Sequence, residues 1–346
     1  VVYQFTGEKW YYSDIVKEHF FNPRNLMLDE PDESQYDAVG MVGSPACLSS
    51  NTLIQLNPAM NTIDQVVRGE RVLGNDGYFH EVKIIFKPRY ESGVIRLKNQ
   101  LGEVTATPDH LIFGIQVPRK KESPFVHTKY KKMMPSSWMH AGDIKKGDFV
   151  LYPIPKEIRR VPSLEIPREK RKNWDFKSIY LPSRITVAED LLELFGYFVA
   201  EGSTRHDGSE VIFTFGGGEE RYARRVDELI KKYFGISTTI KNRPLNHRID
   251  VAVYNIYLAK LFRELFGDSA ENKKVPEFIL FLEPEIQQGF LRGLWRGDGY
   301  FSVRRFQPRA GFATISETLL HQVIWLLLRS KIVPSVYKEK AKIKDG

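Results

Sequence analysis

The chain has 346 residues, with 51 lysines and arginines against 43 aspartates and glutamates, so its formal net charge is +8 at pH 7. Its single cysteine excludes an internal disulfide framework and a cysteine-rich metal site. The sequence has neither the basic and apolar start of a targeting signal nor the ~18 consecutive apolar residues that a membrane span requires. We therefore expect a soluble, cytoplasmic monomer without a membrane partner.

The first 46 residues differ from the rest of the chain in charge. They hold three basic and eight acidic residues, whereas the remainder holds 48 basic and 35 acidic residues. A sharp change at one point suggests that two unrelated segments have been joined. The basic balance of the remainder attracts phosphate whatever the base sequence, which favours a nucleic-acid partner without proving one.

Residues 1–46 carry two motifs, YYSDIVKEHFFNPRN at 11–25 and YDAVGMVGSPA at 36–46. They resemble the start of a NifU-like or IscU-like iron-sulfur cluster scaffold, which is α-helical there and leads to its first cysteine ligand. That family continues with Cys-Gly-Asp or Cys-Gly-Glu, whereas this chain continues CLSSNT. The resemblance implies that an insert begins at Cys47 and that residues 1–46 are its N-terminal extein. A generic helical leader is the alternative.

Residues 47–155 consist of short strand-like runs and turns, with a helical turn at NTIDQVVRGE and an NDG turn at 75–77. Three features follow in order: Cys47, a Thr-x-x-His motif at 107–110 and the segment AGDIKKGDFVLYPI at 141–154. This order is typical of a known family. It resembles the N-terminal part of a HINT splicing domain, the all-β self-processing fold of inteins.

This resemblance implies a role for three residues. Cys47 attacks the carbonyl of Ala46 in an N-S acyl shift, His110 protonates the departing amide nitrogen, and Thr107 hydrogen-bonds near the scissile peptide. Splicing of this kind needs no cofactor, and its partner is the downstream extein of the scaffold. The alternatives are a buried structural cysteine and an ordinary strand-to-turn segment at TPDH.

Residues 156–184 are rich in proline, lysine and arginine and have little periodicity. This composition predicts an extended basic linker, most simply a solvated one. At the other end, the chain finishes with YKEKAKIKDG. An intein normally finishes with a His-Asn pair followed by Cys, Ser or Thr, so we expect a chain that is truncated at its C-terminus.

Residues 185–346 contain two segments with one pattern, LLELFGYFVAEGS at 191–203 and FLRGLWRGDGYF at 290–301. Each predicts an apolar, glycine-spaced helix that ends in a carboxylate, Glu201 in the first and Asp298 in the second. A strand-like run and an amphipathic helix follow both segments, which indicates one structural unit used twice.

Small residues line one face of both predicted helices, since Gly196 matches Gly293 in register. The pattern predicts two closely packed helices that bring Glu201 and Asp298 near one axis. The pair resembles the doubled LAGLIDADG motif of DOD-type homing endonucleases. The resemblance implies an α+β domain with two pseudo-symmetric repeats, the second incomplete, whose sheets form a saddle for a double-stranded DNA target site.

The same resemblance implies a metal site made of Glu201 and Asp298. Mg²⁺ is the expected ion, because hard divalent cations take oxygen ligands and polarise both the attacking water and the leaving oxygen of a phosphodiester. Lys274, in ENKKVPEF with Lys273, resembles a lysine that assists cleavage. Arg296 departs from the family, in which an apolar residue is usual. The alternatives are acids that end helices and a surface lysine.

The segment KNRPLNHR at 241–248 predicts a hairpin with basic and amide side chains. Such side chains can reach base edges in the major groove of DNA. The sequence does not determine which of them read bases.

Together these interpretations predict a multidomain protein. It comprises a short α-helical extein at 1–46, an all-β HINT splicing domain at 47–155, a linker at 156–184 and an α+β LAGLIDADG endonuclease domain at 185–346. The predicted functions are protein splicing and metal-dependent, site-specific cleavage of double-stranded DNA. The alternatives are an inactive DNA-binding remnant, and a scaffold that functions only after splicing of a longer chain, because one cysteine cannot support a cluster.

Overall fold

The computed structural model describes residues 47–56, 60–87, 90–117, 134–168, 179–304 and 307–339. The extein predicted for residues 1–46 lies outside these ranges. Among the described residues, no helix combines the length and the apolar character that crossing a bilayer requires.

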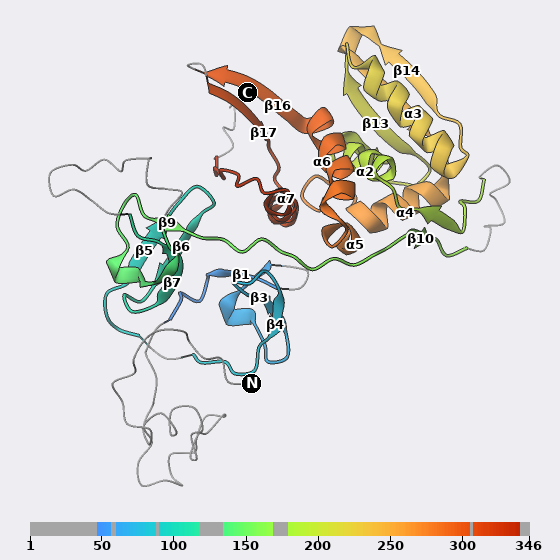
Figure 1. Cartoon of the computed structure of the whole chain (residues 1–346). Helices are drawn as coiled ribbons and strands as arrows, with labels where there is room; N and C mark the ends of the chain where they lie inside the picture. The colour runs from blue at the N-terminus through green and yellow to red at the C-terminus, as the bar shows by residue number, and fades with distance from the viewer. Residues whose placement is uncertain are drawn as a thin grey trace.

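The described residues between 47 and 150 form strands and short turns, with no α-helix (Figure 1). The elements are β1 (Leu53–Gln55), β2 (Met60–Thr62), η2 (Ile63–Gln65), β3 (Arg71–Leu73), β4 (Phe79–Glu81), β5 (Ile95–Lys98), β6 (Glu103–Ala106), β7 (Leu111–Ile115), β8 (Ser137–His140), η4 (Ala141–Asp143) and β9 (Phe149–Val150). Antiparallel sheets pair β1 with β2, β3 with β4 and β5 with β6, and place β7 between β8 and β9. The predicted NDG turn joins β3 to β4, where Gly77 has a φ of +85°.

The connector after β9 is extended, as predicted, but it is fastened to the C-terminal part. The backbone N–H of Arg159 donates to the carbonyl of Phe281 at 2.8 Å. The buried guanidinium of Arg329 donates to the carbonyl of Pro155 at 2.9 Å. These bonds fix the connector, which therefore differs from a freely solvated linker. Its strands pair with each other and are β10 (Ser163–Glu165) and β11 (Arg184–Thr186).

The first repeat consists of helices packed on one face of a four-stranded antiparallel sheet. Its elements are α2 (Glu189–Glu201), β12 (Gly202–Thr204), β13 (Val211–Gly216), α3 (Glu220–Phe234), β14 (Thr239–Arg243), η5 (Pro244–Asn246), β15 (Arg248–Val253) and α4 (Ile256–Phe266). The strand order is β12-β13-β15-β14. Ile249, Val251 and Val253 of β15 join the core under the helices. Asp250 between them therefore points to the opposite, helix-free face.

The second repeat follows the same order of helix, strands and helix. Its elements are α6 (Pro284–Asp298), β16 (Gly299–Arg304), β17 (Gln307–Phe312) and α7 (Glu317–Arg329), preceded by α5 (Glu277–Leu280). This order confirms the predicted duplication for these elements. The strand-like run predicted after the second motif corresponds to β17, which ends at Phe312, and Ser316 then forms the N-cap of α7. Its hydroxyl accepts a hydrogen bond from the N–H of Leu319 at 3.1 Å.

Helices α2 and α6 approach each other through glycine. A Cβ on Gly196 would lie 2.2 Å from the carbonyl oxygen of Phe290, and a Cβ on Gly293 would lie 2.1 Å from that of Glu193. Glu193 and Phe290 are ninety-seven residues apart, as are the two glycines. The contact is therefore symmetric, with the two helices related by a pseudo-two-fold axis.

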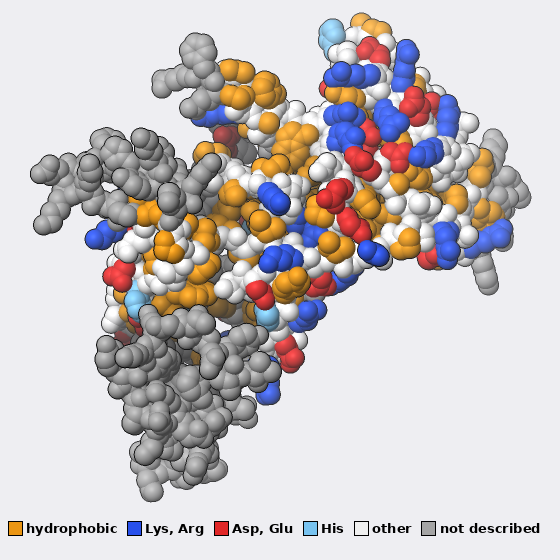
Figure 2. Space-filling view, viewed as in Figure 1, with side chains coloured by type: hydrophobic (Ala, Val, Ile, Leu, Met, Phe, Trp, Pro, Cys, Tyr) orange, Lys and Arg blue, Asp and Glu red, His pale blue; other side chains and the backbone are white. Residues whose placement is uncertain are grey.

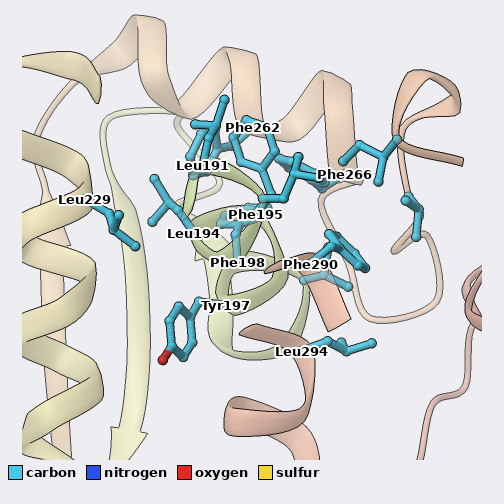
Figure 3. Close-up of a cluster of buried hydrophobic side chains, with 14 of the residues drawn as sticks. Leu191, Leu194, Phe195, Tyr197, Phe198, Leu229, Phe262, Phe266, Phe290 and Leu294 are labelled. Carbon is cyan, nitrogen blue, oxygen red and sulfur yellow. The ribbon is translucent and has the colours of Figure 1, made fainter. Parts of the chain in front are cut away.

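An aromatic core packs α2 against α4 (Figure 3). The ring centroids of Phe195 and Phe266 are 4.9 Å apart, and those of Phe198 and Phe262 are 4.7 Å apart. Edge-on and tilted rings of this kind add specific packing to their burial. They tie α2 to α4, so the carboxylate end of α2 is held by a rigid layer.

A second aromatic cluster joins the N-terminal β part to the second repeat. Phe79 of β4 is 5% exposed and stacks on Trp325 of α7, with centroids 5.8 Å apart. Phe281 meets Phe79 edge-on at 6.1 Å, and the guanidinium carbon of Arg159 lies 3.9 Å from the centre of the Phe281 ring. The β part and the second repeat therefore share buried apolar surface.

Candidate functional site

The two motif carboxylates lie at the same end of the paired helices. Glu201 is the last residue of α2 and Asp298 is the last residue of α6. A Cβ on Gly297 would lie 2.4 Å from the Cβ of Ala200 and 2.9 Å from the Cγ of Glu201. Close contact at Gly297 thus brings the Glu201 side chain against the end of α6. The last turn of a helix also carries a partial negative charge, which disfavours a carboxylate there unless a cation is near.

The electrostatics of the pair reflect this crowding. Burial, together with the negative charges of Asp298 and Glu219, raises the pKa of Glu201 to about 7. Burial also raises the pKa of Asp298, while the positive charge of Lys273 opposes that rise. The two acids therefore resist being ionised together, which is the electrostatic signature of a site that a cation would relieve.

Lys273 is the lysine of ENKKVPEF that lies at this site. It is 8% exposed, and its Nζ donates to the carbonyls of Phe198 and Gly202, each at 2.8 Å. Burial lowers the pKa of Lys273 to about 8, and the charge of Asp298 partly offsets the effect. Lys274, the residue selected from the sequence, lines a separate groove of about 610 Å³ beside α5 and α7. The sequence alone does not indicate which of these two adjacent lysines lies at the carboxylate pair.

Arg296, which departs from the family pattern, has a partner that the sequence did not reveal. Its Nη1 donates to Oε1 of Glu193 on α2 at 2.6 Å. The other carboxylate oxygen of Glu193 accepts from Nη2 of Arg225 on α3 at 3.2 Å. Glu193 is buried, so two guanidiniums satisfy a charge that would otherwise be costly. The departure at Arg296 thus adds a cross-helix ion pair.

The carboxylate pair fits an oxygen-liganded divalent cation. Among the described ranges, histidine, cysteine, aspartate and glutamate form no group of three or more suited to a metal. A structural zinc site needs four such ligands. Magnesium is commonly held by one or two carboxylates, with waters and substrate phosphates completing the shell. Glu201 and Asp298 match that second requirement.

The helix-free face of the first repeat is polar and basic. Thr214, Asp250 and Lys241 are register partners across β13, β15 and β14, and Arg243 pairs with Arg248 at the next row. Partners in antiparallel strands share a face, so these five side chains lie together. Figure 2 shows this repeat from the side that α3 covers, where lysine and arginine side chains mix with acidic ones.

Cys47 and Thr107, two of the residues predicted for splicing, also meet at the edge of the N-terminal β part. The N–H of Cys47 donates to Oγ1 of Thr107 at 2.9 Å, and the N–H of Thr107 donates to the Cys47 carbonyl at 2.9 Å. The N–H of His110 donates to the Thr107 carbonyl at 3.1 Å. Burial and the nearby charge of Asp109 raise the pKa of Cys47. Cys47 and Thr107, which are sixty residues apart in the sequence, are thus in direct contact.

Residues 285–346, which contain most of the second repeat, match a LAGLIDADG-like domain. Over 344 residues the chain is 28% identical to an uncharacterized protein of Methanocaldococcus jannaschii, covering 93% of this chain and 42% of that protein. It is 25% identical to the ATP-dependent DNA helicase Hel308 of Thermococcus kodakarensis, covering 84% and 28%. It is 24% identical to an iron-sulfur cluster assembly SufBD family protein of Mycobacterium tuberculosis, covering 75% and 29%. The chain thus spans less than half the length of these relatives.

Two solved structures match part of the chain at low sequence identity. One is the homing endonuclease I-DmoI in complex with DNA and Mn, with 15% sequence identity and a TM-score of 0.34, covering 45% of this chain and 86% of that one. The other is the N-terminal LAGLIDADG domain of DUF199/WhiA, with 16% identity and a TM-score of 0.31, covering 44% and 70%.

Proposed function

We propose that the C-terminal part of the chain is a metal-dependent DNA endonuclease of the LAGLIDADG type. The observation that carries the proposal is the glycine contact between α2 and α6, which brings two acids of raised pKa to one point. The LAGLIDADG-like match over residues 285–346 supports it, since it includes Asp298. A double-stranded DNA target is the proposed substrate.

The roles of the side chains follow from their positions. Glu201 and Asp298 would hold the divalent cation, Mg²⁺ or Mn²⁺. When bound, the cation polarises the phosphodiester and lowers the pKa of a water. Lys273 keeps the end of α2 in place through the Phe198 and Gly202 carbonyls, and its charge balances part of that on Asp298. The basic helix-free face of the sheet would hold the DNA backbone.

Cleavage of a plasmid library with random genomic inserts tests this proposal. The native chain with Mg²⁺ should linearise a small subset of plasmids at one sequence. Glu201→Gln and Asp298→Asn should abolish linearisation and retain binding to that sequence, because each removes a ligand oxygen's charge without changing shape. Glu220→Gln, an exposed acid at the start of α3, is the matched control and should cleave normally. Scission that persists in both site variants would show that these carboxylates are not the metal ligands.

An inactive DNA-binding remnant is the competing hypothesis for this part of the chain. It predicts binding to one sequence with or without metal, and no scission by the native chain in Mg²⁺ or Mn²⁺. The same library distinguishes the two hypotheses when bound and cleaved plasmids are sequenced separately.

We further infer that residues from Cys47 onward form a self-splicing insert, in which Cys47 begins the N-S acyl shift. The contact that favours this is the N–H of Cys47 on Thr107 Oγ1, because that nitrogen belongs to the bond that breaks. The relatives add independent support. A helicase and an iron-sulfur assembly protein have unrelated activities, and the chain matches a minor part of each. A portable insert in different host proteins accounts for that pattern.

Thiol treatment of the purified chain tests the splicing chemistry. An added thiol should release residues 1–46, seen by mass spectrometry, since it intercepts a thioester at Cys47. Cys47→Ala should abolish release and leave DNA cleavage unchanged. Release that survives in Cys47→Ala would refute the assignment. The host identity, an iron-sulfur scaffold that functions only after splicing, rests on residues 1–46 and stays a prediction.

A further inference from the structure

The hairpin between β14 and β15 ends with two like charges opposite each other. Arg243 and Arg248 are direct register partners, separated by the short turn η5. Like charges directly across two strands are destabilising. The pair therefore needs a compensating group, and the structure provides one on the same face.

Asp250 is that group. Its Oδ2 accepts from Nε of Arg243 at 2.7 Å and from Nη2 of Arg248 at 3.1 Å, while its Oδ1 accepts from Oγ1 of Thr214 at 3.3 Å. The Asp250 side chain is 7% exposed, whereas those of Arg243 and Arg248 are 49% and 44% exposed. Bonds from Arg243, Arg248 and Thr214 outweigh burial and lower the pKa of Asp250. A buried, charged carboxylate thus anchors two arginines whose outer parts face solvent.

The two arginines are anchored differently. Arg243 meets Asp250 through Nε, and among the described residues Nη1 and Nη2 of this half-exposed side chain make no hydrogen bond, so both ends of its fork stay available. Arg248 meets Asp250 through Nη2, so one of its two terminal nitrogens is already occupied by this bond. A guanidinium whose two terminal nitrogens are free and whose stem is fixed matches the O6 and N7 acceptors of guanine in the major groove. Binding a phosphate depends more on positive charge than on a free pair of terminal nitrogens, so Arg248 is suited to a phosphate contact.

We propose that Arg243 reads a guanine base of the DNA target, with Asp250 as its positioning residue and Arg248 as a phosphate contact. The inference deepens the proposed endonuclease function and rests on it. Relative to Gly202, which follows the carboxylate Glu201, Arg243 lies three residues along the strands and three strands across. At about 3.4 Å per residue and 4.8 Å per strand, this is about 18 Å, or about five base steps. The guanine is therefore expected about five base pairs from the site of cleavage.

Selection of bound duplexes from a pool randomised around the target tests the proposal, with Glu201→Gln as the background so that no DNA is cut. The variant Arg243→Lys keeps the charge and removes the fork. It should lower the preference for guanine at one position by about 5-fold to 100-fold and leave the other positions and the salt dependence unchanged. Asp250→Asn should reduce the same preference, because it releases the guanidinium.

Three variants at two positions provide the controls. Arg248→Lys should leave base preferences intact, and Arg248→Ala should weaken binding to all sequences and reduce the salt slope by about one. Arg224→Ala removes an exposed charge from α3, on the helix side of the sheet, and should change neither. Circular dichroism melting of each variant separates unfolding from lost recognition.

The possible failures are distinguishable. Loss of affinity for every sequence in Arg243→Lys, or an unchanged guanine preference, would overturn the base-reading role while DNA binding itself stands. A Glu201→Gln background that binds no duplex at all would overturn the proposed function instead.

Discussion

At the scale of single residues, the account depends on charges placed where they are unfavourable without a ligand. Glu201 and Asp298 occupy helix C-terminal ends, and neither has an arginine or lysine ion pair among the described residues. Glu193, on the same helix as Glu201, contrasts with them because two arginines neutralise it. Glu193 therefore stabilises the fold through its ion pairs, whereas Glu201 and Asp298 are available to bind a cation.

The raised pKa of Glu201 predicts a dependence of stability on pH. Because its pKa is about 7 in the folded chain against an ordinary 4.5, folding favours its protonated form. Its contribution is fully present below pH 4.5 and is lost as pH rises through 7. Metal-free native protein should therefore lose stability to urea between pH 5 and pH 8 relative to Glu201→Gln. Parallel pH profiles for the two proteins would contradict the raised pKa.

Lys273 and Lys274 allow a comparison of neighbours. Lys273→Met leaves the carbonyls of Phe198 and Gly202 without their donor and should cost about 2–4 kcal/mol of unfolding free energy. The same change at Lys274, which lines an open groove, should cost less than about 0.5 kcal/mol. Chemical denaturation measures both, and plasmid cleavage should fall only in Lys273→Met. Equal losses of stability and of cleavage in the Lys273 and Lys274 variants would contradict the different roles assigned to these two residues.

At the scale of elements, the α2–α6 contact sets the geometry of the site. Gly196 and Gly293 let the backbones touch, and the side chains on either side of them fill the core (Figure 3). Any larger residue at these positions would push the helices apart and separate Glu201 from Asp298. Helix packing and the position of the carboxylates are therefore linked.

Gly196→Ala tests this link. Its Cβ would lie 2.2 Å from a backbone oxygen, which no side-chain movement can relieve, so we expect a loss of about 3 kcal/mol in unfolding free energy and of most cleavage. Gly93→Ala is the control, since nothing lies within 4 Å of a Cβ there. Thermal melting and plasmid cleavage compare the two, and a Gly196→Ala protein with native melting and activity would contradict the close contact.

Periodicity and repetition predicted the elements well, because apolar spacing and small residues are local properties of a sequence. The helix ends at Glu201 and Asp298, the hairpin at 241–248 and the duplication follow from them. The choice between Lys273 and Lys274 could not be predicted, since it depends on how a loop meets α2. The Glu193–Arg296 pair and the anchoring of Arg243 by Asp250 were missed for the same reason.

At the scale of the whole molecule, the β part and the second repeat are connected by more than a chain. Phe79 enters the core of the C-terminal part between Trp325 and Phe281. Buried Arg329 also bonds the carbonyls of Pro155 and Glu157 in the connector. A composition that predicted a solvated linker could not reveal these contacts, because they come from residues more than 170 positions apart.

Phe79→Ala tests whether the two parts unfold together. Deleting a buried phenylalanine costs about 3–5 kcal/mol, and here the loss falls on the contact between the parts. The single cooperative transition expected of the native chain should separate into two in calorimetry. Phe86→Ala, at a side chain 72% exposed, should preserve the native profile. One undivided transition at the native temperature in Phe79→Ala would show that the parts are independent.

The central claim is that Glu201 and Asp298 form one cation site between two helix ends. Titration of Mn²⁺ into the native chain, followed by electron paramagnetic resonance of the free ion, measures this directly. The account predicts uptake by the native chain and by Glu220→Gln, and loss of that uptake in both Glu201→Gln and Asp298→Asn. Uptake of Mn²⁺ by both site variants at native affinity would contradict it.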